Sequence, residues 1–185
     1  MPSGLGPVRL ARSEHLGCDE SRRGRPCAGA VASFRPVPRR PASYFLVDGF
    51  DVRAEAARLC ALPALGGPDG RMATTPPELT IRRASRRPRR TQGFAVPAQH
   101  RVSVTVYPGI RRGDLLETLL HELVHLAVGE SPESRRWHGR QFRETLAAAM
   151  AQAYGVRVQG AAASRHGAYA EAIQRRIETL RAAAA

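Results

Sequence analysis

Regular spacing of apolar residues begins at residues 44–47, a short run that predicts a strand. Asp51 follows at a position typical of a helix N-cap, and the apolar positions after it predict a short helix over residues 51–62. Residues 63–77 contain seven glycines and prolines, which predict a loop. The chain therefore enters its regular part with a strand, a short helix and a long connection.

Strands are also predicted at residues 79–81, 92–96 and 101–107. The strand at 101–107 is the strongest, because valines at alternate positions share one face while Arg, Ser, Thr and Tyr share the other. Pro108 and Gly109 end the strand.

The second half of the chain shows helical spacing. Asp114 with Glu117 three positions later resembles a capping box, and it predicts a helix that runs to about Val128 and stops at Gly129. Three more elements are predicted downstream: a helix over residues 138–154, a short strand over 156–158 and a last helix over 169–181. Helices and strands are mixed without strict alternation, which predicts an α+β fold.

His121, Glu122 and His125 form an HExxH motif inside the first of these helices. The i, i+4 spacing places both imidazoles on one helix face, where they can reach a single Zn²⁺ at about 2.0–2.1 Å. Glu122 follows the first ligand directly, so its carboxylate lies near the open side of the ion and can accept a proton from water. The alternative is a structural pair of histidines at the edge of the core.

A catalytic zinc site needs a third protein ligand and leaves one position for water. His138 is the best candidate, because it lies 13 residues after His125, across a loop and at the start of the next predicted helix. Glu144 on that helix is the second candidate. The alternative for His138 is an ordinary surface histidine.

The helix TLLHELVH, preceded by a β-rich strand and followed by Trp137-His138-Gly139 and Phe142, resembles the SprT-like zinc metalloproteases. It is also similar to the small zincin domains of the WLM and YgjP-like groups. The resemblance covers residues 92–155, and the HGxxF segment makes it more specific than HExxH alone. Many SprT-like proteins carry a C-terminal zinc ribbon, but no cysteine follows Cys60 here, so a ribbon is not expected.

This resemblance implies a small zincin-like α+β domain, with a short, mainly antiparallel sheet packed on the HExxH helix and a second, ligand-bearing helix. It implies one catalytic Zn²⁺ held by His121, His125 and His138. Glu122 would be the general base, and Phe142 would be a packing residue that seats the second helix. The implied activity is hydrolysis of peptide bonds in a protein or peptide substrate.

Two further roles are assigned as hypotheses. The strand at 101–107 would border the cleft and pair with an extended substrate, unless it is an interior strand of the sheet. The transition state needs a partner besides the metal, and the candidates are Tyr107, Arg101, Tyr154 and Arg143.

The charge is concentrated in two segments. The chain has 29 basic residues, all of them arginine, against 16 acids. Residues 1–40 hold eight of the arginines and three acids, and residues 81–92 hold six arginines and no acid. We therefore predict a disordered basic arm over residues 1–42 and one zincin-like domain over residues 43–185, with a basic loop at 82–91 and a motif core at 92–155.

The arginines of this basic loop are candidates for non-specific contacts with nucleic-acid phosphates, because guanidinium groups bind phosphates in bidentate fashion. A solvated loop without specific contacts, an acidic protein partner and a membrane surface are the alternatives. No aromatic residues interleave the run, so single-strand recognition is not supported by the sequence. The candidates are Arg82, Arg83, Arg86, Arg87, Arg89 and Arg90.

The remaining composition narrows the class of protein. Three cysteines without a CxxC pair argue against a disulfide framework, a zinc ribbon and an iron–sulfur cluster. With no signal-peptide core and no long apolar stretch, we expect a cytoplasmic protein without a membrane partner. The favoured function is a zinc metalloendopeptidase, with substrates among nucleic-acid-associated proteins. A binding module with a zincin fold but no turnover, and a hydrolase of another bond, are the alternatives.

Overall fold

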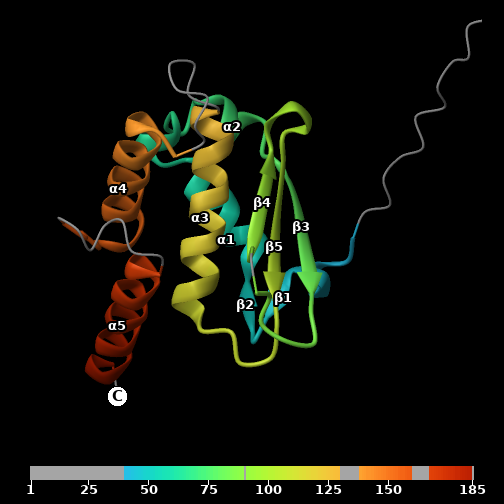
Figure 1. Ribbon diagram of the computed structural model, residues 1–185, viewed down its shortest axis with the longest axis vertical. Coiled ribbons are helices and arrows are strands. Elements are labelled where there is room, and N and C mark those ends of the chain that lie inside the picture. The colour runs from blue at the N-terminus through green and yellow to red at the C-terminus, as the bar shows by residue number, and fades with distance from the viewer. Residues whose placement is uncertain (1–39, 90, 130–137, 160–166, 185) are drawn as a thin grey trace, which may run out of the picture. The chain divides into compact units, whose positions relative to one another are not determined.

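The computed structural model describes residues 40–89, 91–129, 138–159 and 167–184 (Figure 1). Residues 39–185 form one compact unit. The predicted basic arm, residues 1–42, lies almost wholly outside the described residues, so it stays a prediction. Within the described residues, no helix combines the length and apolar character needed to cross a membrane.

The described part of the chain contains short 3-10 helices (η), α-helices and strands, which confirms the predicted α+β class. In chain order the elements are η1 (Ala42–Phe45), β1 (Leu46–Val47), β2 (Phe50–Asp51), α1 (Val52–Cys60), η2 (Pro63–Leu65), α2 (Arg71–Thr74), β3 (Glu78–Arg83), β4 (Gly93–Val96), η3 (Pro97–Gln99), β5 (Arg101–Val106), α3 (Arg112–Val128), α4 (Arg140–Tyr154) and α5 (Ala168–Ala183).

The main sheet has three strands in the order β3-β5-β4. After β3 the chain crosses to the opposite edge of the sheet and forms β4, and it then turns back to form β5 between β3 and β4. As a result β5 is antiparallel to β4 and parallel to β3. Strands β1 and β2 form a separate antiparallel pair. Antiparallel pairings are thus the more numerous among the described residues, but the longest pairing, β3 with β5, is parallel and the main sheet is mixed.

Helix α3 covers one face of this sheet, and α4 and α5 pack against the other side of α3 (Figure 1). The core lies between α3 and β5, where Leu119, Leu120 and Leu123 are fully buried together with Val102 and Val104. Each of these side chains contributes about 1.5–3 kcal/mol by leaving water. The HExxH helix is therefore held rigidly by its apolar stripe, as the sequence predicts.

The face of β5 that carries Ser103 and Thr105 is covered by side chains of the neighbouring strands. Ser103 is 1% and Thr105 is 8% exposed. Phe94 of β4 is opposite Ser103 and Arg82 of β3 is opposite Thr105, and the Arg82 Cζ atom lies 5.7 Å from the centre of the Phe94 ring. These two side chains meet over β5, so they shield a face that would otherwise contact solvent.

The outer edge of β3 is blocked by a side chain. The Tyr44 hydroxyl donates to the Ile81 carbonyl at 2.6 Å and accepts from the Ile81 amide at 3.0 Å. This replaces the bonds that a neighbouring strand would make. It also accounts for the first predicted strand being shorter than expected: Tyr44 belongs to η1, and only Leu46 and Val47 are extended.

Helix ends follow the sequence in part. Asp51 is the N-cap of α1, since its carboxylate accepts from the amides of Arg53 and Ala54. The predicted capping box is wrong, because α3 begins earlier, at Arg112, and Asp114 pairs with the Arg111 side chain at 2.8 Å. The predicted stops are confirmed, since α3 and α4 both end at a glycine with positive φ.

Three other predicted segments differ from the structure. The loop at residues 63–77 contains the short helices η2 and α2, and residues 156–158 form no strand. The latter follow α4, on the side of α3 away from the sheet, where no strand is available to pair with them (Figure 1). Arg82 and Arg83, placed in the basic loop by the sequence, continue β3 because they pair with β5.

Candidate metal centre

Three histidines converge beside the C-terminal half of α3. His121 and His125 lie one turn apart on this helix, and His138 lies just before Gly139, the N-cap residue of α4. Their Nε2 atoms are 3.1, 3.1 and 3.2 Å apart in the three pairings. This group could hold a metal ion.

The donor set fits a cation better than a hydrogen-bond network. An imidazole nitrogen either carries a proton and donates or offers a lone pair and accepts, so three nitrogens that face one another cannot all be satisfied. A cation shared by three lone pairs removes this conflict. Three tetrahedral zinc ligands at about 2.0–2.1 Å from the ion stand roughly 3.3 Å apart, and the observed triangle is only slightly smaller.

Phe142 forms the base of this triangle. Its ring centre lies 5.0 Å from that of His121, 4.4 Å from that of His125 and 4.8 Å from that of His138. Phe142 is buried and sits in the first turn of α4. It therefore packs under all three imidazoles, a wider contact than the seating of the second helix that the sequence implies. Trp137, the neighbouring motif residue, lies outside the described residues.

Glu122 is buried beside the histidines, with 7% of its surface exposed. It lies against β4, and a β-carbon added to Gly93 would stand 2.8 Å from its Cγ atom. The sequence analysis missed Gly93, although a glycine inside a strand often marks the close approach of another group. Here that group is the carboxylate of the HExxH motif.

Burial sets the protonation of these groups in the absence of a cation. It raises the pKa of Glu122 to about 7, because the buried carboxylate is poorly solvated. Burial and then the charge of His138 lower the pKa of His125 to about 4, so this imidazole is neutral at pH 7 and keeps a lone pair for an ion. A nearby cation would lower the pKa of Glu122 again, because it favours the charged carboxylate.

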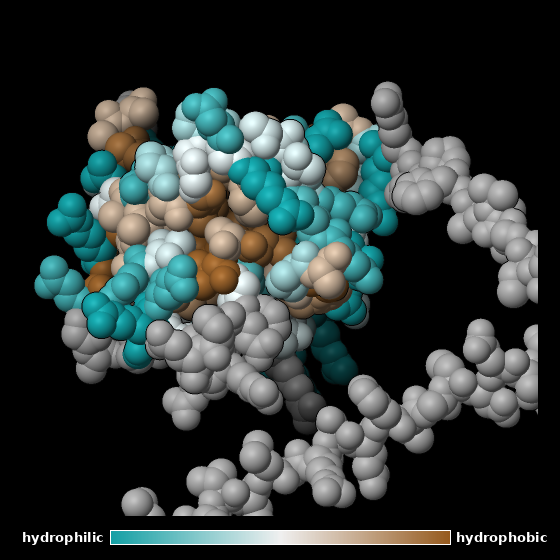
Figure 2. Space-filling view, turned by 90° about the horizontal axis from the view of Figure 1, so that it is seen from above, coloured by the Kyte–Doolittle hydropathy of each residue, from teal (hydrophilic) through white to brown (hydrophobic). Residues whose placement is uncertain are grey.

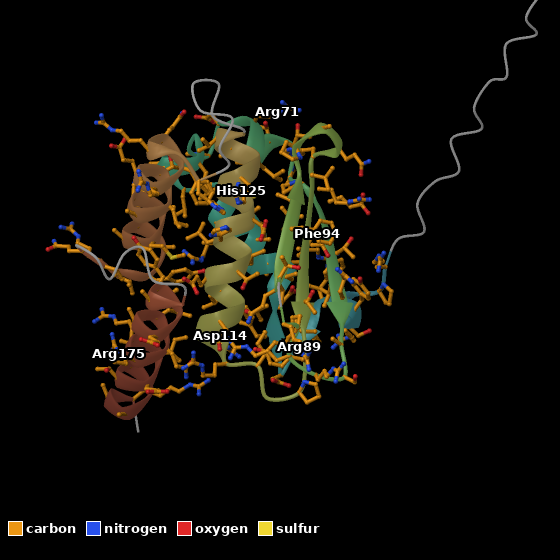
Figure 3. All side chains as sticks on the ribbon, viewed as in Figure 1. Arg71, Arg89, Phe94, Asp114, His125 and Arg175 are labelled. Carbon is orange, nitrogen blue, oxygen red and sulfur yellow. The ribbon has the colours of Figure 1, made fainter. Side chains whose placement is uncertain are left out.

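A groove of about 300 Å³ opens beside the histidines. Two of its lining residues, His125 on α3 and Phe94 on β4, are labelled in Figure 3. The groove runs between α3 and the outer edge of β4, and its lining residues are Thr91, Gly93, Phe94, Ala95, Glu122, His125 and His138. Strand β5 is not part of it, because β5 is paired on both sides. The hypothesis that residues 101–107 pair with a substrate is therefore wrong, and the strand is the interior one.

The other candidates lie elsewhere. Glu144 is exposed and its carboxylate pairs with Arg140 at 2.7 Å, so it does not join the histidines. The Tyr154 hydroxyl donates to Glu55 at 2.9 Å. The other three transition-state candidates, Tyr107, Arg101 and Arg143, are also absent from the groove lining. The structure therefore brings none of the four candidates to Glu122.

The arginine candidates differ in the contacts that they make. Arg83 donates to the carbonyls of Tyr44 and Leu46, so its guanidinium holds the fold together. Arg82 contacts Phe94 on the face of the sheet opposite α3. Arg90 lies outside the described residues. The remaining three are exposed, with no carboxylate partner among the described residues: Arg86, Arg87 and Arg89.

Fold and site together define a small zincin-like α+β domain with a candidate metal centre of three histidines. A model of the SprT-like family matches residues 70–165, which is just over half of the 185 residues. The chain belongs to the SprT-like family, which is linked to zincin-like metallopeptidases. The match extends beyond the motif core at both ends. No curated protein and no solved structure matches the chain.

Proposed function

We propose that this protein is a zinc-dependent metalloendopeptidase, in which His121, His125 and His138 hold the ion and Glu122 is the general base. The observation that carries the proposal is the triangle of three Nε2 atoms beside a buried carboxylate. When bound, zinc supplies a Lewis acid that acidifies water and polarises a carbonyl group.

Glu122 is the proton carrier in this mechanism. Its carboxylate takes a proton from the attacking water and later delivers it to the leaving amine. The other titratable side chains that line the groove are His125 and His138, whose lone pairs hold the ion, so neither of them competes for that proton. Because Gly93 has no side chain, β4 can lie close to Glu122, and the β4 backbone then limits the space in which the carboxylate can move.

The outer edge of β4 holds the substrate in an extended conformation. Gln92 accepts a backbone bond from Thr105, and in an antiparallel pair such bonds fall on alternate residues. Gly93 and Ala95 therefore turn their amide and carbonyl groups away from β5, toward the groove. A peptide that pairs with these groups as an added strand passes directly beside Glu122.

We also propose that the substrates include nucleic-acid-associated proteins. The support is a group of residues that we call the basic face of the main sheet: Arg82 and Phe94 on its strands, with Arg86, Arg87 and Arg89 in the loop that follows β3. The fold places Phe94, which is 38% exposed, beside Arg82, although the two are far from adjacent in sequence. An exposed aromatic ring beside one guanidinium group, with three further exposed arginines in the adjoining loop, suits a nucleic acid strand, because bases stack on aromatic rings and phosphates pair with guanidinium groups.

The competing function is a nucleic-acid- or protein-binding module without turnover, and one experiment separates the two. Zinc-loaded protein is incubated with casein and with a mixed peptide library, beside the Glu122→Gln variant and the control Glu144→Gln. We expect cleavage by wild type and by the control, and a loss of about 10²–10⁴-fold in Glu122→Gln at unchanged zinc content. A zinc-loaded wild type that cleaves nothing while it binds nucleic acid tightly would favour the binding module.

A further inference from the structure

A second cavity, the α2 pocket, lies at the end of the molecule where α3 finishes. It has a volume of about 270 Å³. Figure 2 views the molecule from this end and shows apolar surface in the middle, bordered by hydrophilic residues. The α2 pocket is lined by Leu65, Arg71, Met72, Pro97, His100, Leu126 and Ala127.

The α2 pocket lies further along the same two parts of the chain, α3 and the β4 segment, that line the groove of the candidate metal centre. Leu126 lies one helical turn beyond Glu122 on the same face of α3, since residues four apart stack on one side of a helix. Pro97 lies two residues beyond Ala95, at the end of β4. The groove holds Glu122 and Ala95, and the α2 pocket holds Leu126 and Pro97. Both elements therefore lead from the metal centre into the pocket.

This geometry sets the distance along a bound peptide. An extended chain advances about 3.4 Å per residue, so the step from Gly93 to Pro97 covers four residues and roughly 13 Å. A peptide that lies along β4 with its reacting bond beside Glu122 reaches the α2 pocket two to four residues from that bond. The pocket can therefore receive a side chain of the substrate, but not the bond itself.

The lining of the α2 pocket combines apolar and basic side chains. Leu65 and Met72 are buried and form an apolar wall. The His100 ring is fixed by a contact of 2.6 Å with the Thr75 carbonyl oxygen. Arg71 is exposed at the first residue of α2, above His125 in Figure 3. Among the residues that the structure describes, no carboxylate pairs with Arg71.

We propose that the α2 pocket is a specificity site for a glutamate side chain of the substrate, whose carboxylate pairs with Arg71 while its methylene groups pack on the apolar wall. This inference rests on the proposed function, because it concerns the substrate of the same centre. An exposed guanidinium that pairs with no carboxylate of the described residues provides the charge that such a carboxylate complements. A leucine would fill the wall but leave Arg71 unused, and a lysine would face a like charge.

The test is cleavage-site profiling of a mixed peptide library by mass spectrometry. Wild type is compared with Arg71→Glu, Arg71→Gln and the control Arg175→Glu, whose side chain is exposed on α5 (Figure 3). We expect glutamate enrichment at one position two to four residues from the cleaved bond. Arg71→Gln should lose the enrichment, and Arg71→Glu should change it to lysine or arginine. The ratio of kcat/KM for a peptide with glutamate at this position to kcat/KM for the same peptide with lysine should fall about tenfold or more in the Arg71 variants.

Each outcome decides the proposal. Arg71 makes no side-chain bond among the described residues, so both variants should melt within a few degrees of wild type and keep their zinc. Cleavage without glutamate enrichment, or enrichment that survives in Arg71→Glu, overturns the α2 pocket as a specificity site and leaves the peptidase proposal standing. A zinc-loaded wild type that cleaves no peptide overturns both. A matching change in Arg175→Glu would show a general charge effect and would also overturn it.

Discussion

The Gly93 backbone touches the Glu122 side chain: a β-carbon at this glycine would lie 2.9 Å from Oε1 and 2.8 Å from Cγ. The same β-carbon would lie 2.8 Å from the Cγ2 atom of Thr118. Real β-carbons do not approach other atoms this closely, so a larger residue must displace both neighbours. Thr118 is tied by its hydroxyl to the Asp114 carbonyl at 2.8 Å, so the Glu122 side chain is the neighbour that moves more easily.

Gly93→Ala should therefore lower peptidase activity through kcat. We expect a loss of roughly 10–10²-fold, smaller than that from removing the base, with little change in KM or in zinc content. Steady-state kinetics and metal analysis measure the two effects. Wild-type kcat in a folded, zinc-loaded Gly93→Ala protein would show that the position of the carboxylate is not restricted by β4.

His138→Ala should remove the metal. Three nitrogens are needed to hold the ion with one position open, and the remaining pair on α3 offers only two. We expect zinc stoichiometry to fall from one to near zero after dialysis. Glu144→Ala is the control, because its carboxylate pairs with Arg140 outside the centre. Full zinc retention in His138→Ala would move the third ligand elsewhere.

Cys60 should make the fold sensitive to alkaline pH. Burial raises the pKa of its thiol from 9.0 to about 11, because the thiolate is poorly solvated in the core. The folded state thus favours the protonated thiol. Its contribution is fully present below pH 9 and is lost as pH rises from 9 to 11, a change of at most about 2.7 kcal/mol in the free energy of unfolding.

Urea unfolding at pH 8, 9 and 10 measures this loss, with Cys60→Ala as the comparison. The variant should start less stable, because it leaves a small cavity, but its stability should fall less between pH 9 and 10. Burial also raises the pKa of Tyr154, whose contribution is lost only above its ordinary value near 10. Identical slopes for both proteins below pH 10 would contradict the assignment to Cys60.

The basic face of the main sheet should bind nucleic acid in a salt-dependent manner. A triple variant in which Arg86, Arg87 and Arg89 are changed to alanine should bind a fluorescent oligonucleotide at least tenfold more weakly. The slope of log Kd against the logarithm of the salt concentration should also fall by about two to three. Phe94→Ala should weaken single-stranded binding more than duplex binding. Changing Arg175 and Arg176 on α5 controls for total charge, and an equal effect there would argue against this face.

The metal centre could be anticipated from sequence because its spacing is local. His121, Glu122 and His125 follow from helix periodicity alone, and the structure places His138 with them, as the HGxxF resemblance implies. The triple contact of Phe142 could not be predicted, because it depends on the angle at which α4 meets α3.

The sheet shows the opposite case. Alternation in residues 101–107 correctly predicts a strand but carries no information on strand order, so it could not decide between an edge strand beside the cleft and the interior strand that β5 is. The meeting of Arg82 with Phe94 across β5 has the same origin, since each lies on a different neighbour of that strand. Which residues meet across β5 depends on the order of the strands in the sheet, and the residue pattern within one strand does not contain that order.

The hydroxyl of Tyr44 on Ile81 has a consequence for self-association. With the β3 edge closed, two copies of the main sheet could join into a continuous one only through β4, and that join would cover both grooves at once. Dimerisation by this route and entry of a peptide would therefore compete for the same backbone groups. High protein concentration would then act as a reversible inhibitor.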